Sequence, residues 1–246
     1  MKPPIKIAFF PGPHELVVGT VPRVVGTLTS LAQPFPAPRR KVPCDVVEVR
    51  LDKTGPVPDW LARCQEIEKR GWPVLLTIRL RNEGGEWAGG DARRFPLFEK
   101  ALFELAGVDV EWRSKIVYPV AILAKRKRKV CVISYHDFEK TPPAEKLEAI
   151  VSEAQELASV VKIATRLNGA GDEDVLRTLL ARKWKRPLCV IGMGAKWTHT
   201  RVLFPKLGSC LAYGYLDSAM APGQMSAAEL TRQLGVEKTA VVSIAP

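Results

Sequence analysis

Short runs of apolar and β-branched residues recur along the chain, each bounded by turn residues, as is typical of buried β-strands. Eight such runs follow the N-terminal segment. They span residues 23–28, 45–51, 74–80, 108–112, 130–135, 160–165, 188–193 and 210–215. The pattern therefore predicts eight strands.

Amphipathic, helix-like stretches lie between most of these runs. Residues 144–158 have apolar positions at helical spacing, and residues 172–181 begin with the acidic side chains that a helix N-terminus favours. Strands that alternate with helices indicate parallel βαβ units. We therefore expect an α/β fold in which residues 1–246 form a single (β/α)8 TIM barrel domain, with a doubly wound sheet as the alternative. Residues 5–19 are expected to form a hairpin over the barrel floor.

Length and composition agree with this fold. A chain of 246 residues, 46% hydrophobic and 26% charged, is typical of a globular protein, and one barrel uses about 250 residues. No apolar run reaches the roughly 18 residues of a membrane-spanning helix. The sequence therefore predicts no membrane partner.

The cysteines and the N-terminal sequence bear on location. The five cysteines form no C-x-x-C pair, and an odd count argues against a disulfide framework and against a structural zinc site. Residues 1–19 lack the pattern of a secretory signal, because their apolar stretch is short and broken by prolines. These features predict a reducing, cytoplasmic location.

Polar and charged side chains interrupt four predicted strands near their C-terminal ends. Such residues are costly to bury without partners, and alternate residues of a barrel strand point inward. They are Glu48, Arg50, Thr77, Arg79, Ser134, His136 and Lys162. Each could be a structural residue with satisfied partners. Because all fall at the rim where barrel enzymes keep their active sites, we expect a catalytic site there.

The residue types point to imine chemistry. Lys162 is flanked by apolar residues, which together with nearby arginines should disfavour its charged form. A neutral amine attacks carbonyls, and His136 could then move a proton on the adjacent carbon. A carboxylate such as Glu83 could orient this histidine, while arginines hold an anionic substrate. The glycine and lysine motifs that bind nucleotides do not occur.

Several short motifs follow one another along residues 22–230. They are Asp45-Val-Val-Glu48-Val-Arg50-Leu-Asp52, Thr77-Ile-Arg79 with Glu83-Gly84-Gly85, Ser134-Tyr-His136-Asp137-Phe138, Val161-Lys162-Ile163-Ala164, Thr200-Arg201, Gly208-Ser209 and Ala221-Pro222-Gly223-Gln224. With these motifs in this order and spacing, the chain resembles the type I 3-dehydroquinase family.

The resemblance implies a (β/α)8 barrel, commonly a homodimer, that acts as a carbon–oxygen lyase (hydro-lyase). Such an enzyme dehydrates 3-dehydroquinate to 3-dehydroshikimate and water by syn elimination through a lysine imine (Schiff base). The reaction belongs to the shikimate pathway, which leads to chorismate and the aromatic amino acids. The resemblance implies neither a metal nor a cofactor.

The resemblance also assigns roles to residues. Lys162 falls on the imine-forming lysine, His136 on the general acid and base, and Glu83 on the carboxylate that positions the histidine. The expected substrate-binding residues are Thr27, Glu48, Arg50, Arg79, Arg201, Tyr213 and Gln224. Among them, Arg201 matches the arginine that holds the substrate carboxylate, and Gln224 lies in the loop that closes over the substrate.

One position departs from the family. Met220 stands where many members have a serine, two residues before the proline of the lid motif. The lid would lose one hydroxyl contact, and we expect it to close less tightly over the substrate.

Three other functions compete with this interpretation. A class I aldolase is also a barrel with an imine-forming lysine, and an inactive barrel could act as a binding protein. The net charge of +11 suggests nucleic-acid binding, but of the basic runs at residues 39–41, 125–129 and 182–186 only the last contains an aromatic residue, Trp184. Each run precedes a strand and should lie at the barrel floor. We expect a solvated face there, with a surface for polyanions or acidic partners as the alternative.

Overall fold

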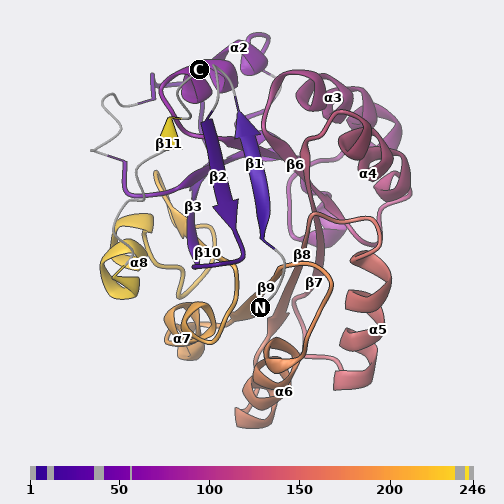
Figure 1. Ribbon diagram of the computed structural model, residues 1–246, viewed down its shortest axis with the longest axis vertical. Helices are drawn as coiled ribbons and strands as arrows, with labels where there is room; N and C mark the ends of the chain where they lie inside the picture. Colours follow the sequence, from indigo (N-terminus) through magenta and orange to yellow (C-terminus); the bar gives the residue numbers. More distant parts are fainter. Residues whose placement is uncertain (1–3, 10–13, 36–41, 56, 236–241, 244–246) are drawn as a thin grey trace.

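The computed structural model describes residues 4–9, 14–35, 42–55, 57–235 and 242–243. Eight parallel strands form one sheet (Figure 1). They are β3 (Arg23–Leu28), β4 (Val46–Arg50), β5 (Val74–Thr77), β6 (Gly107–Glu111), β7 (Val130–Asp137), β8 (Val160–Arg166), β9 (Leu188–Met193) and β10 (Leu211–Tyr215). The predicted strands and the TIM barrel are confirmed, with boundaries that differ by up to three residues.

Helices connect the strands and cover the outside of the barrel. They are α1 (Leu51–Thr54), α2 (Trp60–Lys69), α3 (Gly90–Glu104), α4 (Val117–Arg126), α5 (Ala144–Ala154), α6 (Ala170–Ala181), α7 (Thr200–Lys206) and α8 (Ala227–Leu234), with short 3-10 turns η2 (Arg81–Glu83) and η3 (Ala195–Trp197). None of the helices in the described ranges is both long enough and apolar enough to cross a membrane.

The sheet runs in the order β10-β3-β4-β5-β6-β7-β8-β9, which leaves one seam between β9 and β10. Ser209 bridges this seam, because its Oγ accepts a hydrogen bond from the Val190 amide at 2.9 Å and donates to the Leu211 carbonyl at 3.2 Å. The Cys210 amide also donates to the Leu188 carbonyl at 2.9 Å. A side chain therefore completes what backbone pairing does elsewhere in the barrel.

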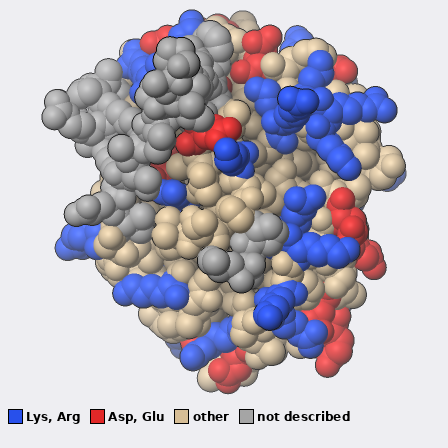
Figure 2. Space-filling view, viewed as in Figure 1, with Lys and Arg blue, Asp and Glu red and all other residues tan. Residues whose placement is uncertain are grey.

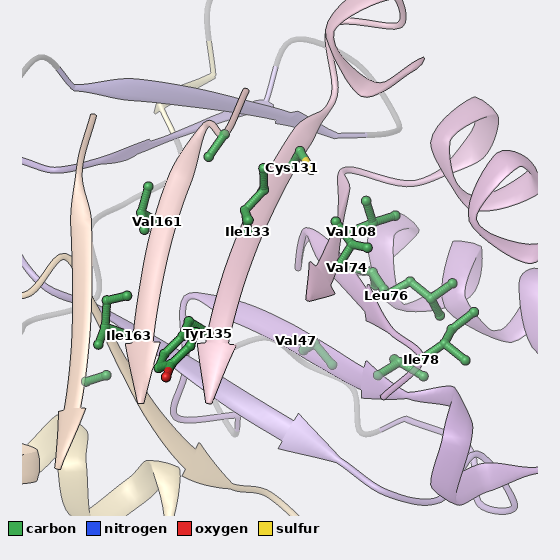
Figure 3. Close-up of a cluster of buried hydrophobic side chains, with 14 of the residues drawn as sticks. Val47, Val74, Leu76, Ile78, Val108, Cys131, Ile133, Tyr135, Val161 and Ile163 are labelled. Carbon is green, nitrogen blue, oxygen red and sulfur yellow. The ribbon is translucent and has the colours of Figure 1, made fainter. Parts of the chain in front are cut away.

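The strands bury both faces. One face packs against the helices, and Figure 3 shows part of this layer, including Leu76, Ile78, Ile133, Tyr135 and Ile163. The alternate residues point into the barrel, which is the periodicity that a strand imposes. Polar residues such as Ser134 and Lys162 therefore face the barrel interior, while their neighbours Ile133, Val161 and Ile163 face the helices.

The N-terminal hairpin is confirmed. Strands β1 (Ile5–Phe9) and β2 (His14–Val18) pair antiparallel, and β11 (Val242–Ser243) pairs with β2 as a third strand. Figure 1 shows β1 and β2 crossing in front of the barrel. Ile7 and Val18 pack on the residues at the N-terminal ends of the barrel strands. The hairpin thus closes the floor, and the opposite end stays open for a site.

Candidate active site

One cavity of about 500 Å³ opens at the C-terminal end of the strands. All ten residues that the sequence analysis assigned to the site line it. They are Thr27, Glu48, Arg50, Arg79, Glu83, His136, Lys162, Arg201, Tyr213 and Gln224. They come from five strands, η2, α7 and two loops, so residues far apart in the sequence surround a single space.

Lys162 projects from the middle of β8 and is 5% exposed. Its Nζ donates to Oδ2 of Asp109 on β6 at 3.1 Å and lies 4.2 Å from the centroid of the Tyr213 ring. The amine therefore lies between the carboxylate of Asp109 and the face of an aromatic ring. The sequence analysis named apolar residues and arginines as neighbours of this amine and overlooked Asp109.

Asp109 is 1% exposed and contacts the side chains of both Lys162 and Arg79. Besides Lys162, it accepts a hydrogen bond from Nη2 of Arg79 at 2.7 Å and one from the Ser134 hydroxyl at 2.6 Å. Burial alone would raise the pKa of Asp109, but Arg79 and Lys162 hold it well below its usual range. Asp109 is therefore a fixed negative charge beneath the cavity.

A second buried ion pair fixes the loop after β5. Nη1 of Arg94, on α3, donates to Oε2 of Glu111 at 2.6 Å and to the Ile78 carbonyl at 2.6 Å. Oε1 of Glu111 accepts from the Leu80 amide at 3.0 Å and lies 3.4 Å from Nη1 of Arg79. These bonds anchor the backbone on both sides of Arg79, just before the turn that carries Glu83.

Two glycines allow the Glu83 turn to close. Gly84 has a φ of +78°, and a Cβ there would lie 2.3 Å from the Phe138 ring. A Cβ on Gly85 would lie 2.1 Å from the carbonyl oxygen of Arg79. No other residue fits either position without displacing a neighbour. The Glu-Gly-Gly sequence is therefore both a tight turn and the support for a cavity side chain.

His136, near the end of β7, faces Glu83. Its Nδ1 lies 3.3 Å from Oε2 of Glu83, within ion-pair distance but without the alignment of a hydrogen bond. Burial, together with Arg79 and Lys162, lowers the pKa of His136 well below its usual value. The imidazole is therefore neutral at neutral pH and can accept a proton. Such contacts often align only when substrate is bound.

Glu83 itself is 3% exposed, and burial raises its pKa to about 7. The Arg113 guanidinium opposes this rise from 3.7 Å away, and it lies 4.4 Å above the ring of Tyr135. The carboxyl group thus titrates near neutral pH, where it can share a proton with its histidine neighbour.

Phe138 closes the other side of His136. The two rings are stacked, with centroids 5.9 Å apart and an interplanar angle of 11°. The same phenyl ring touches Gly84 and lines the cavity. It therefore restrains the imidazole between an aromatic face and the Glu83 turn.

The opposite wall is held by a carboxylate and two hydroxyls. Glu48 is 3% exposed and accepts hydrogen bonds from Thr27 at 2.9 Å and Thr77 at 2.8 Å. Nearby, Arg50 makes a bidentate pair with Asp52 at 2.9 and 2.8 Å. Each charged group is therefore fixed before any ligand enters.

Arg201, on α7, differs from the other arginines of the cavity. Its guanidinium has no hydrogen bond or ion pair with any residue that the structure describes, and burial lowers its pKa to about 10. A partly desolvated guanidinium with free donors is suited to a carboxylate ligand. The Tyr213 hydroxyl is similarly buried without a hydrogen-bond partner in the described part of the chain.

The lid loop after β10 lies over Arg50. Sδ of Met220 accepts a hydrogen bond from Nη1 of Arg50 at 3.3 Å, and the Met220 amide donates to Oε1 of Gln224 at 2.7 Å. Gly223, with a φ of +77°, packs against Ala195 and Thr198 of the loop after β9. Met220 therefore occupies a donor that a ligand could use.

Sequence reasoning gave no role in the site to Asp109, Arg113 or Phe138, although Phe138 stands in one of the motifs. Asp109 had a usable signal, because an acidic residue inside an apolar strand is as unusual as the Glu48–Arg50 pair that was singled out. Arg113 and Phe138 lie beyond strand ends, and only the fold brings them to Glu83 and His136. No group of three or more His, Cys, Asp or Glu in the described ranges could hold a metal ion.

Comparison with known proteins gives one family. The family model described as "Type I 3-dehydroquinase" matches residues 26–240. A "3-dehydroquinate dehydratase" of Methanocella arvoryzae is 35% identical over 216 residues, covering 87% of this chain and 96% of that protein. The crystal structure of 3-dehydroquinate dehydratase from Aquifex aeolicus is 26% identical with a TM-score of 0.70, covering 85% of this chain and 96% of the other. That from Geobacillus kaustophilus has a TM-score of 0.77 at 24% identity, covering 89% and 93% of the two chains, which shows the shared fold.

The raised pKa of Glu83 predicts how stability changes with pH. A folded-state pKa of about 7, above the ordinary 4.5, means that stability contributed by the protonated carboxyl is complete below pH 4.5 and is lost as the pH rises through 7. Glu83→Gln removes this titration. Urea titrations give the free energy of unfolding of the variant minus that of the native protein. We expect this difference to be more favourable to the variant at pH 8 than at pH 5. A difference that is the same at both pH values would contradict the burial effect.

Proposed function

The chain belongs to the type I 3-dehydroquinase family and is a 3-dehydroquinate dehydratase of the shikimate pathway, and we propose that Lys162 carries its reaction as an imine. One observation supports the assignment most. A buried lysine amine, a neutral histidine beside a carboxyl group, and a guanidinium without a partner in the described structure line a single cavity. The hydro-lyase reaction needs these three kinds of group together.

In the first step, Nζ of Lys162 attacks the C3 carbonyl carbon of 3-dehydroquinate, and the carbonyl oxygen leaves as water with one proton from Nζ and one from solvent. The resulting iminium is positively charged at the position of Nζ. Asp109, 3.1 Å from that atom and held anionic, offsets the new charge. The carboxylate therefore both orients the amine and stabilises the imine that follows.

In the second step, neutral His136 removes a proton from C2, and the electron pair moves into the imine to give an enamine. The enamine then expels the C1 hydroxyl, which takes the proton from His136 and leaves as water. Hydrolysis of the remaining conjugated imine releases 3-dehydroshikimate and returns Lys162. Glu83 and the stacked Phe138 act by keeping the imidazole oriented during both proton transfers.

The remaining polar groups of the cavity hold the substrate. We assign its carboxylate to Arg201, which no other described residue neutralises, and its ring hydroxyls to Glu48, Arg50 and Arg79. Thr27, Tyr213 and Gln224 complete the wall and the lid. The arginine ion pairs with Asp52 and Asp109 fix the binding geometry in advance, which reduces the entropy lost on binding.

Imine formation and proton transfer can be separated experimentally. With 3-dehydroquinate and borohydride, the native protein should gain the mass of one reduced adduct on Lys162, and Lys162→Ala should show neither adduct nor turnover. His136→Ala should still form the adduct while kcat falls by about 10²–10⁴-fold, because only the proton transfers are lost.

Mass spectrometry of the borohydride-treated proteins and absorbance of the enone product provide the two readouts. An adduct that forms with an aldol substrate but not with 3-dehydroquinate would support the aldolase alternative instead. An adduct that survives in Lys162→Ala would place the imine on another amine.

Met220 provides a test of the lid. Its sulfur is a weak acceptor that occupies Nη1 of Arg50, so a substrate hydroxyl must displace it. In Met220→Ser we expect KM to fall about fivefold, the equivalent of one hydrogen bond of about 1 kcal/mol, with little change in kcat. Met193→Ser is the matched control, because Met193 lines the same cavity without a hydrogen bond to Arg50. A KM that stays constant or rises in Met220→Ser would refute the interpretation.

We further propose that residues 1–246 act as one domain, in a cytoplasmic homodimer. The odd number of cysteines, all of them buried, supports a reducing compartment, and the family resemblance supports the dimer. Light scattering of the purified protein should then give twice the chain mass of 27.2 kDa. A mass equal to one chain at micromolar concentration would exclude the dimer.

A further inference from the structure

A run of five consecutive cations, Lys125 to Lys129, joins the end of α4 to the start of β7. It lies at the N-terminal end of the barrel strands, opposite the cavity that contains Lys162. Figure 2 shows a dense group of Lys and Arg side chains where Figure 1 places α3 and α4, on the face that bears β1 and β2. This group plays no part in the reaction.

The charges of this run are not neutralised locally. None of its five side chains forms an ion pair with an acidic residue in the described part of the chain, and the first four are exposed. The basic run at residues 182–186 is different, since Arg182 pairs with Glu148 at 2.7 Å and Lys185 with Glu156 at 2.5 Å. Like charges at such spacing repel one another, so the run is available to an external anion.

The backbone conformation at Arg128 is one that usually holds a glycine. The Lys129 amide donates to the Ala124 carbonyl at 2.8 Å and the Arg128 amide to the Lys125 carbonyl at 3.2 Å, which is the Schellman ending of a helix. This ending requires a left-handed residue, usually glycine, at the position of Arg128. Arg128 has a φ of +55° and is the one non-glycine residue with a positive φ in the described ranges. An arginine at this position carries a conformational cost that glycine avoids. Backbone conformation therefore does not explain why position 128 holds a positively charged residue.

An aromatic ring from another helix lies within the same surface. Phe103, near the end of α3, is 54% exposed, and Nζ of Lys127 lies 3.5 Å from its ring centroid. Cations beside an exposed aromatic face are the combination that single-stranded nucleic acids bind, because phosphates pair with the cations and bases stack on the ring. The sequence did not reveal this, since residues 103 and 127 belong to different helices.

We propose that Lys125 to Lys129 together with Phe103 form a binding surface for single-stranded nucleic acid, separate from the active site. The cations contact successive phosphates, and a base packs against the exposed part of the Phe103 ring. An acidic polypeptide would use the charges but would not need the ring. The exposed aromatic side chain therefore favours a nucleic acid over an acidic protein.

Arg128→Gly tests the proposal, because it should act in opposite directions on folding and on binding. Removing one phosphate contact should raise the Kd for a fluorescent 20-nucleotide oligouridylate about fivefold at about 0.1 M salt. It should also reduce the steepness of the plot of log K against log salt concentration by about 0.7. Fluorescence anisotropy measures both quantities. The melting temperature should stay the same or rise, since glycine suits the left-handed position.

Two further variants separate the contributions of charge and ring. Lys183→Gln removes one exposed charge from the other basic run and should leave the Kd unchanged. Phe103→Leu keeps an apolar side chain and should weaken binding severalfold while the salt slope stays constant. Turnover of 3-dehydroquinate should equal that of the native protein in all three variants, because none of the positions lines the cavity.

Several results would overturn the proposal. The native protein could fail to bind the oligouridylate at 50 mM salt, or Lys183→Gln could weaken binding as much as Arg128→Gly, which would indicate net charge alone. Tighter binding of polyglutamate than of RNA would indicate an acidic protein partner. A lower melting temperature in Arg128→Gly would mean that the arginine is present for stability.

Discussion

The carboxylate of Asp109 is the interaction on which the active site depends. It is almost fully buried and contacts both Arg79 and Lys162, so a single negative charge makes it possible to keep two cations inside the barrel. A lone buried ammonium or guanidinium would be very costly to desolvate. The position of the reactive amine is therefore set by a residue from a different strand, at 3.1 Å.

The same arrangement separates the charged side of the cavity from its neutral side. Arg79 and Lys162 are balanced from below, yet their positive field, added to burial, keeps His136 uncharged. Glu83 lies further out and titrates near neutral pH because burial acts on it more strongly than Arg113 does. A reactive amine and a neutral base can therefore coexist within one cavity. Lys162 has the opposite charge of Asp109 beside it, and His136 is buried against the ring of Phe138.

Much of the fold could be predicted from the sequence. Strands buried on both faces leave continuous apolar runs, and eight such runs separated by helices have few compact arrangements. Polar residues at the ends of these runs, from Glu48 to Lys162, stand out because burial in a strand is otherwise reserved for apolar side chains. Boundaries were less accurate where a strand gives way to a turn, as at Thr77, because side-chain contacts made elsewhere decide the last residues of a strand.

By itself, the sequence determined the barrel, the floor hairpin and the residues that surround one cavity, because periodicity and motif order are properties of the chain alone. Only the tertiary structure decided which charges meet. It paired Lys162 with Asp109, stacked His136 against Phe138, left Arg201 without a partner among the described residues, and placed Phe103 beside a basic run from another helix. These contacts join different elements of the barrel, and Coulomb and stacking energies depend on distance in space rather than on separation along the chain.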